Sequence, residues 1–370
     1  MKFIADRDKL LDSLNAVSHA VAARTTQQIL ECILVKADDT LRVYGNDLEL
    51  GIESADIEAE IEEPGSVALE AKIFLDIVRK MPAGFIHIDA DRQNVTKLKS
   101  GRSEFKVLGQ PGDEFPLPEK MDKDAGFEIN AADFKDMIRQ TIFSVAVDES
   151  KPVLTGELLQ IKDGCVHLVS VDGFRISYRR SKDAETAPEA SKSVVVPAKS
   201  LTELGRILPS DGDARLFFYI KDTHILFQTD RHTLISRLLT GEFIRYNQIF
   251  NEDFNTLINI NRQQLLMGLE RASLLTRENK NNPVKLSIGQ DTVVITSNTE
   301  MGASYDEAAA EIDGAPLDIA FNPKYLIDAL RVIDDENVVM TFTGALSPCI
   351  IKGAGIDCFK YLILPLRLKN

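Results

Sequence analysis

The chain has 370 residues, 44% of them hydrophobic, and a formal net charge of −14 at pH 7. This size and composition suffice for two or three folded domains and exclude a disordered or fibrous protein. The 57 acidic residues outnumber the 43 basic ones, which argues against a surface that binds nucleic acid everywhere. The first residues, MKFIADRDKLLDSL, read as neither a signal peptide nor a membrane span, so we expect a cytoplasmic protein.

Cysteine and histidine spacing gives no sign of a metal centre. The four cysteines and five histidines are scattered, without CxxC, HxxxH or HExxH patterns. The sequence therefore predicts no metal site and no disulfide framework. It also lacks the P-loop, GxGxxG and GxSxG motifs of nucleotide-binding and hydrolytic enzymes, so no cofactor is expected.

One pattern of elements recurs three times along the chain. Each copy opens with a strand and a helix whose apolar residues keep the same steps of seven and four. Asp6, Asn130 and Asn261 precede these helices and are expected N-caps. The matching apolar positions are Phe3, Leu10 and Leu14, then Phe127, Phe134 and Ile138, then Ile258, Leu265 and Leu269.

A strand pair and a second helix follow in each copy. We expect Asp47, Asp172 and Asn298 to mark the turn of the strand pair. The second helix then begins at Lys72, Lys199 or Lys324. Both marks recur at a period of about 125 residues, which is too long for a solenoid repeat, so each copy should be a domain.

The repeat predicts an α+β fold, with antiparallel sheets that carry two helices per domain on one face. The expected domains are residues 1–122, 123–253 and 254–370. Linkers are expected at residues 116–126 and 251–255. If the three domains are equivalent, their helices lie on one common face of the assembly.

Basic residues recur on the predicted helices, whereas the strand segment ESADIEAEIEE (53–63) has six acids and no base. Sparse cations on a common helix face suit contacts with a nucleic-acid backbone, which need no base-reading residues. A solvated helix face explains the charges alone more simply, because the same helices also carry acidic residues.

The chain ends on an unusually apolar segment, YLILPLRL (361–368), although termini are normally polar and frayed. This segment is expected to complete a sheet, with Pro365 favouring an edge position. VDGFR (171–175) is expected to form a hairpin with an Asp-Gly turn. A groove for an extended partner segment is compatible with both expectations.

From residue 1 to 368 the chain resembles the bacterial replicative sliding clamp, the beta subunit of the DNA polymerase III holoenzyme. The resemblance rests on the order of the opening MKFIADRDKLLDSL, AARTTQQIL (22–30), VDGFR and YLILPLRL. It implies a head-to-tail homodimer whose six clamp domains close around duplex DNA, with helices inside and sheets outside. Such a ring is a non-enzymatic processivity factor that tethers the replicative polymerase.

The resemblance also implies a hydrophobic groove that binds a Gln-Leu-x-Leu-Phe type motif of the DNA polymerase catalytic subunit, the clamp loader and other replication and repair proteins. The groove positions matched in this chain are Leu154, Val171, Gly173, Phe174, Arg175, Ile176, Ile244, Gln248, Ile249, Ser347, Pro348, Leu362, Ile363, Leu364, Pro365, Leu366 and Arg367. The implied DNA-facing residues are Arg24, Lys72, Arg79, Lys199, Arg206 and Lys324. The implied dimer-interface residues are Phe105, Val107, Leu274 and Leu275.

Two departures from the family pattern concern function. Ile244 and Gln248 stand where many members have Pro and Arg, so the groove rim is expected to prefer a somewhat different motif. Lys151 is the only base in SVAVDESKPVL (144–154), which weakens the case for DNA contact from that loop.

Two other functions stay open. One is an enzyme with a dispersed carboxylate site, which a perturbed acid in a shared pocket would support. The other is a purely structural repeat protein. Three equivalent copies without a distinguished catalytic one speak against the first, and the basic helix residues speak against the second.

Overall fold

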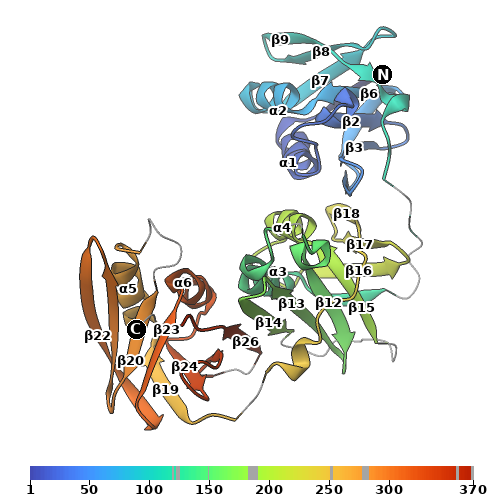
Figure 1. Ribbon diagram of the computed structural model, residues 1–370. Coiled ribbons are helices and arrows are strands. Elements are labelled where there is room, and N and C mark those ends of the chain that lie inside the picture. Colours follow the sequence, from blue (N-terminus) through green and yellow to red (C-terminus); the bar gives the residue numbers. More distant parts are fainter. Residues whose placement is uncertain are drawn as a thin grey trace. The chain divides into compact units, whose positions relative to one another are not determined.

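The computed structural model is drawn in Figure 1. It divides into two compact units. It describes residues 1–118, 121, 126–148, 150–181, 191–250, 253–276, 283–355 and 358–367. One unit comprises Met1–Ala132 with Lys199–Leu238, and the other comprises Asp133–Ala198 with Leu239–Asn370. Within the described residues, no helix is long and apolar enough to cross a membrane.

The first unit contains two antiparallel sheets and helices α1 (Arg7–Ser18), α2 (Ala71–Lys80) and nearly all of α4 (Ala198–Ile207). The five-stranded sheet has the order β5 (Ala59–Glu63), β1 (Lys2–Asp6), β7 (Phe85–Ala90), β8 (Val95–Ser100), β9 (Ser103–Leu108). The nine-stranded sheet has the order β10 (Gln110–Pro111), β6 (Gly65–Glu70), β2 (Cys32–Ala37), β3 (Leu41–Asn46), β4 (Leu50–Ser54), β18 (His232–Arg237), β17 (His224–Gln228), β16 (Arg215–Lys221), β11 (Phe127–Asn130).

Local sequence explains how α1 begins and which face it buries. The Asp6 carboxylate accepts the N–H groups of Asp8 (2.9 Å) and Lys9 (3.0 Å), as expected of an N-cap. Leu10 and Leu14, four residues apart, are fully buried. The predicted cap and the predicted apolar face are both confirmed.

The second unit contains one twelve-stranded antiparallel sheet, most of α3 (Ala131–Thr141), α5 (Arg262–Ser273) and α6 (Pro323–Val332). The strand order is β15 (Lys192–Pro197), β12 (Gly156–Lys162), β13 (Cys165–Val171), β14 (Arg175–Arg180), β26 (Phe359–Ile363), β25 (Cys349–Gly353), β24 (Asn337–Phe342), β19 (Thr256–Asn261), β22 (Gly302–Gly314), β21 (Thr292–Thr299), β20 (Val284–Ile288), β23 (Leu317–Phe321). Short 3-10 helices lie at η1 (Gln28–Glu31), η2 (Gly112–Glu114), η3 (Ile142–Ser144), η4 (Pro152–Thr155) and η5 (Tyr246–Gln248).

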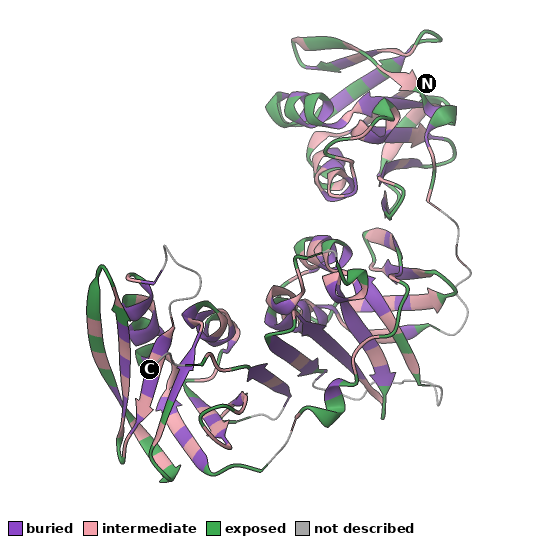
Figure 2. Ribbon diagram, viewed as in Figure 1, coloured by how far each residue is buried: buried purple, intermediate pink, exposed green. Residues whose placement is uncertain are grey.

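Helices pack on the sheets through their apolar faces, and Figure 2 shows buried residues along the strands and on one side of the helices. The Asn261 carboxamide caps α5 by accepting the N–H of Gln264 (3.1 Å). On the same helix Leu265 and Leu269 are fully buried. The predicted α+β class, with helices backing antiparallel sheets, is confirmed.

One predicted turn position is wrong. Asp47 and Asp172 do lie between consecutive strands, but Asn298 lies inside β21. The reason is that β21 and β22 keep pairing as far as Thr299 and Gly302, which shortens the turn. The two predicted linkers lie partly outside the described residues, so their conformation stays a prediction.

Candidate functional site

The terminal strand β26 divides its side chains between two apolar layers because successive side chains of a strand point to opposite faces. Tyr361 and Ile363 belong to the core formed with β24, β25 and α6, and each is 1% exposed. Leu362 joins a different cluster, with Val171 and Ile176. Ile363 is therefore a core residue, and its assignment to a surface groove is corrected.

The cluster around Leu362, called the junction cluster below, combines segments far apart in sequence. Residues from η4, β12, β13, β14, β15, η5, β25 and β26 meet in it. Five predicted groove positions are among them. The buried members are Leu154, Leu158, Val169, Val171, Ile176, Val195, Tyr246, Ile350 and Leu362, and partly buried Ala146, Val153, Tyr178, Leu239, Phe243, Ile244 and Phe250 pack against them.

Some predicted groove positions carry exposed apolar side chains. Phe174 is 54% exposed at the β13–β14 turn, where Gly173 adopts a positive φ of 91°. Leu364 is 37% exposed, and its N–H donates to the Phe174 carbonyl (2.9 Å). Ile249 is also exposed, after η5. Exposed apolar side chains of this kind suit contacts with the side chains of a docked peptide.

The last described residues run beside another strand edge. The Leu366 N–H donates to the Ala320 carbonyl of β23 (2.7 Å), and Pro365 before it has no N–H to leave unpaired. Ser347 and Pro348 are half-buried in the loop before β25, and Arg367 is exposed. Two backbone hydrogen bonds thus hold the terminal segment along an edge and leave Leu364 uncovered.

A cavity of about 480 Å³ lies beside the junction cluster. Predicted Ile244 and Gln248 line it, together with residues that the sequence did not suggest. Burial raises the pKa of Tyr246 to about 12, so its hydroxyl stays protonated and donates to Gln160 Oε1 (2.7 Å). The complete lining is Leu158, Gln160, Ser193, Gly241, Glu242, Phe243, Ile244, Arg245, Tyr246, Asn247 and Gln248.

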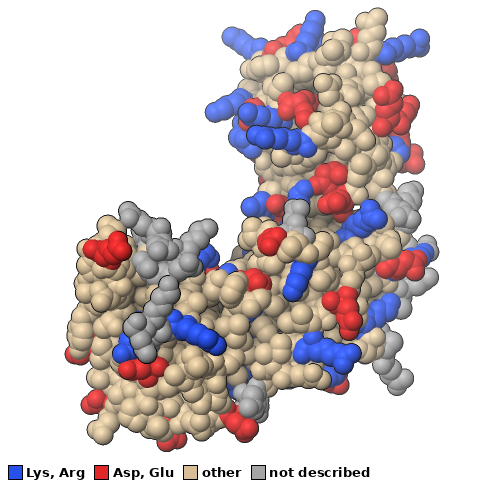
Figure 3. Space-filling model, in the orientation of Figure 1, with Lys and Arg blue, Asp and Glu red and all other residues tan. Residues whose placement is uncertain are grey.

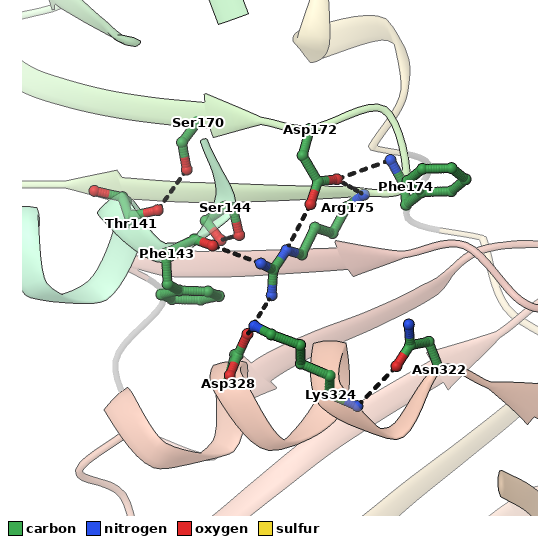
Figure 4. A network of polar contacts seen from close by, with 11 residues as sticks. Thr141, Phe143, Ser144, Ser170, Asp172, Phe174, Arg175, Asn322, Lys324 and Asp328 are labelled. Carbon is green, nitrogen blue, oxygen red and sulfur yellow. Dashed lines mark hydrogen bonds and ion pairs between the residues drawn. The ribbon is translucent and has the colours of Figure 1, made fainter. Parts of the chain in front are cut away.

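Arg175, another predicted groove residue, is turned into the protein instead (Figure 4). Its side chain is 7% exposed, and its guanidinium donates to Asp172 (3.0 Å), Asp328 (2.8 Å) and the Phe143 carbonyl (2.5 Å). It also lies over the Tyr325 ring, 4.7 Å from the centroid. Arg175 therefore holds the predicted groove wall through internal contacts rather than offering hydrogen bonds to a partner.

The Arg175 network orders the exposed turn between β13 and β14, which carries part of the predicted groove. The second oxygen of Asp172 accepts the N–H groups of Phe174 (2.9 Å) and Arg175 (3.0 Å). The Phe174 ring stacks on Tyr325, with centroids 6.2 Å apart. Consequently the Phe174 carbonyl, which holds Leu364, is positioned by α6 as well as by its own hairpin.

The predicted DNA-facing cations lie on or near helices within each unit, and most are paired with carboxylates. Arg24 and Lys72 are exposed. Figure 3 shows basic and acidic side chains interleaved on the visible face. The ion pairs are Arg79 with Asp76 (3.2 Å), Lys199 with Asp47, Arg206 with Glu203 (2.7 Å) and Lys324 with Asp328 (2.5 Å).

The predicted interface residues lie beside strand edges. Phe105 (43% exposed) and half-buried Val107 are on β9, the last strand of the five-stranded sheet. Leu274 (58% exposed) and half-buried Leu275 follow α5 in the other unit. There, residues 302–309 of β22 pair with β21 on one side only among the described strands.

Chemistry-bearing groups are sparse across the described part of the chain. No group of three or more His, Cys, Asp or Glu side chains could hold a metal ion there. Burial raises the pKa of Glu157 to about 8, but this carboxyl is fully buried in the core and does not line the cavity beside the junction cluster. A carboxylate enzyme would need a perturbed acid in a shared pocket. Glu157 does not meet this requirement because it lies in the core.

Comparisons with known proteins agree along the whole chain. Models of the DNA polymerase III beta subunit match its N-terminal domain to residues 1–119, its central domain to 128–244 and its C-terminal domain to 247–367. The Beta sliding clamp of Bacillus subtilis is 35% identical, over 99% of this chain and 100% of that protein. Crystal structures of the Bacillus subtilis DNA polymerase sliding clamp (35% identity) and the Pseudomonas aeruginosa DNA polymerase III subunit beta (28%) each have a TM-score of 0.94, with full coverage of both chains.

Proposed function

We propose that this chain, which belongs to the DNA polymerase III beta subunit family, closes as a homodimer around duplex DNA and tethers the replicative polymerase there. It is a sliding clamp, a processivity factor without catalysis of its own. The observation that carries this function is the match of three successive clamp domains over the full length of its relatives. A topological tether raises the local concentration of polymerase on DNA without requiring tight contacts.

Strand pairing within the chain supports a head-to-tail ring. At one domain junction β4 pairs antiparallel with β18, and at the next β14 pairs with β26. Two strand segments in the first and third domains correspond to these: β9 and residues 302–309 of β22. Among the described strands, each pairs on one side only. Pairing β9 of one copy with β22 of another would form the same kind of junction twice in a two-fold ring and leave neither of these two edges open.

The proposed interface also has apolar side chains to bury. Phe105 and Val107 of one copy would pack near Leu274 and Leu275 of the other. Exposed Leu108, Met301 and Tyr305 lie on or beside the same strand edges and would be covered as well. Such a contact combines sheet continuation with a hydrophobic core, as obligate interfaces do.

The proposed partner site is the groove over the junction cluster. The Leu and Phe of a docked motif would occupy the apolar surface between Phe174, Leu364 and Ile244, and its Gln would meet the polar rim at Asn247 and Gln248. Partners of this kind are the polymerase catalytic subunit, a clamp loader and other replication or repair proteins. A protein that acts on bacterial chromosomal DNA would be located in the cytoplasm.

The test of this function combines two measurements on the full-length protein. Sedimentation should give a dimer, and a fluorescent Gln-Leu-Ser-Leu-Phe peptide should bind it saturably, whereas a peptide with Leu and Phe changed to Ala should not. Leu364→Ala with Leu366→Ala should weaken the peptide at least tenfold, about 1.4 kcal/mol, and leave the dimer intact. A dimer that does not bind the peptide would contradict the proposed groove. A monomer would contradict the proposed ring.

A further inference from the structure

Three cations expected to face DNA share one type of ion pair. In each pair the cation is well exposed but its carboxylate is nearly buried. The exposures of the cation and carboxylate side chains are 55% and 10% in Lys199–Asp47, 56% and 12% in Arg206–Glu203, and 67% and 17% in Lys324–Asp328. In an ordinary pair of this protein, Lys285 with Asp318, the carboxylate is the more exposed partner (35% and 58%).

The three carboxylates Asp47, Glu203 and Asp328, called the counter-ion set below, each have a second partner. Asp47 Oδ1 accepts the N–H groups of Glu49 (3.0 Å) and Leu50 (2.7 Å), while its other oxygen meets the lysine. Glu203 Oε2 lies 2.9 Å from His19 Nδ1. None of these second partners is one of the three exposed cations.

Asp328 shows the arrangement most clearly, because one of its oxygens serves two cations (Figure 4). Asp328 Oδ2 accepts from Lys324 Nζ at 2.5 Å and from Arg175 Nη1 at 2.8 Å. Arg175 is buried and is also held by Asp172 and the Phe143 carbonyl. Lys324 is therefore the exchangeable partner, and Arg175 is the permanent one.

A buried carboxylate that loses its only partner is strongly destabilised, which would discourage a cation from leaving it. A second, fixed partner removes most of that penalty. We infer that the counter-ion set holds Lys199, Arg206 and Lys324 when no phosphate is near and releases each of them to a passing phosphate. This inference rests on the proposed clamp function, which places these cations against duplex DNA.

The arrangement lowers the strength of each phosphate contact because phosphate and carboxylate compete for the same cation. It should therefore reduce the salt dependence of DNA binding below the value that the exposed cations would give alone. Contacts that are weak and independent of sequence allow a ring to move along DNA. The carboxylates of the counter-ion set are thus positioning residues for the DNA-facing cations.

The test is the affinity of the full-length dimer for a short fluorescent duplex, measured by anisotropy between ~50 and ~200 mM salt. Asp328→Asn keeps an acceptor for Arg175 but removes the charge that holds Lys324. It should bind DNA several-fold more tightly at low salt and steepen the plot of log affinity against log salt by about 0.9. Lys324→Gln alone should weaken binding slightly and should not steepen the plot, because it removes a weak phosphate contact. The double variant should match Lys324→Gln.

Asp318→Asn is the matched control, since it removes the same charge from a pair between two strands. Steepening by Asp318→Asn, or equal steepening by Asp328→Asn with and without Lys324, would overturn the inference. The same cycle with Asp47→Asn and Lys199→Gln is an independent test if Asp328→Asn unfolds. Identical slopes in every variant, or no DNA binding by any form of an intact dimer, refute the counter-ion role alone, whereas a monomer in sedimentation contradicts the clamp function itself.

Discussion

Glu157 gives the sharpest stability prediction, because a carboxyl occupies a core position of β12. Along that strand Glu157, Leu159 and Ile161 share one face, and all three are essentially unexposed. Neither carboxyl oxygen has a hydrogen-bond partner among the described residues. Burial raises the pKa of Glu157 to about 8, and the nearby Thr141 hydroxyl offsets only part of that rise.

The size of the effect follows from linkage. Protonating a carboxyl whose ordinary pKa is 4.5 costs about 1.4 kcal/mol for each pH unit above that pKa. At pH 7 the cost is about 3 kcal/mol. The folded pKa is raised, so stability from the protonated form is complete below about pH 4.5 and is lost as pH rises through about 8. Glu157→Met should therefore stabilise the protein by about 3 kcal/mol at pH 7 and by much less near pH 5.

Hydrogen exchange of the β12 and β13 amides measures this locally in a protein whose domains can unfold separately. Wild type and Glu157→Met are compared at pH 5, 7 and 8, so that the intrinsic exchange rate cancels at each pH. Glu157→Gln is the matched control, which removes the pH dependence but keeps a buried polar group. A gain in protection that is equal at pH 5 and pH 8 would refute the reasoning.

Three further outcomes are expected. Phe105→Asp should weaken the dimer by about 2 kcal/mol or more, seen as monomer in sedimentation velocity, since it places a charge in the proposed interface; an unchanged dimer would remove β9 from that interface. Arg175→Lys should lower the free energy of unfolding by about 2–3 kcal/mol, because an ammonium does not reproduce the planar fork that reaches three acceptors, and urea unfolding followed at the groove would show it. Gln248→Arg should change which groove peptide binds best, without changing dimer stability, and equal peptide preferences would show that this rim position does not select the motif.

Most of the domain plan could be predicted from the sequence because it is local and repeated. The caps at Asp6 and Asn261 and the buried helix positions depend on residues within one or two turns. The turn predicted at Asn298 was wrong because it relied on the repeat alone. The equivalence of Asn298 to Asp172 does not reveal how far β21 and β22 keep pairing. Register beyond a turn depends on the partner strand, which a repeat comparison does not contain.

The surroundings of the predicted groove could be predicted only in part because several of their properties arise from long-range contacts. Leu362 and Ile363 are neighbours in an apolar run, yet only the pairing of β26 with β14 and β25 decides which one faces the junction cluster. The partner of Arg175, Asp328, is far away in sequence and has no motif of its own. Leu158 and Tyr246 were missed because ordinary core patterns explain them.

The net negative charge of the protein is compatible with a topological tether. A net charge of −14 would be a handicap for a protein held on DNA by affinity, because phosphate contacts would have to overcome general repulsion. A closed ring is retained by its connectivity, so its inner cations have only to keep the duplex from adhering to one wall. In the proposed ring, cations that share mostly buried carboxylates would supply such weak contacts, and acidic strands elsewhere would discourage DNA from binding outside. On this argument the acidic composition, which argued only against a surface that binds nucleic acid everywhere, would serve the same purpose as the paired helix cations.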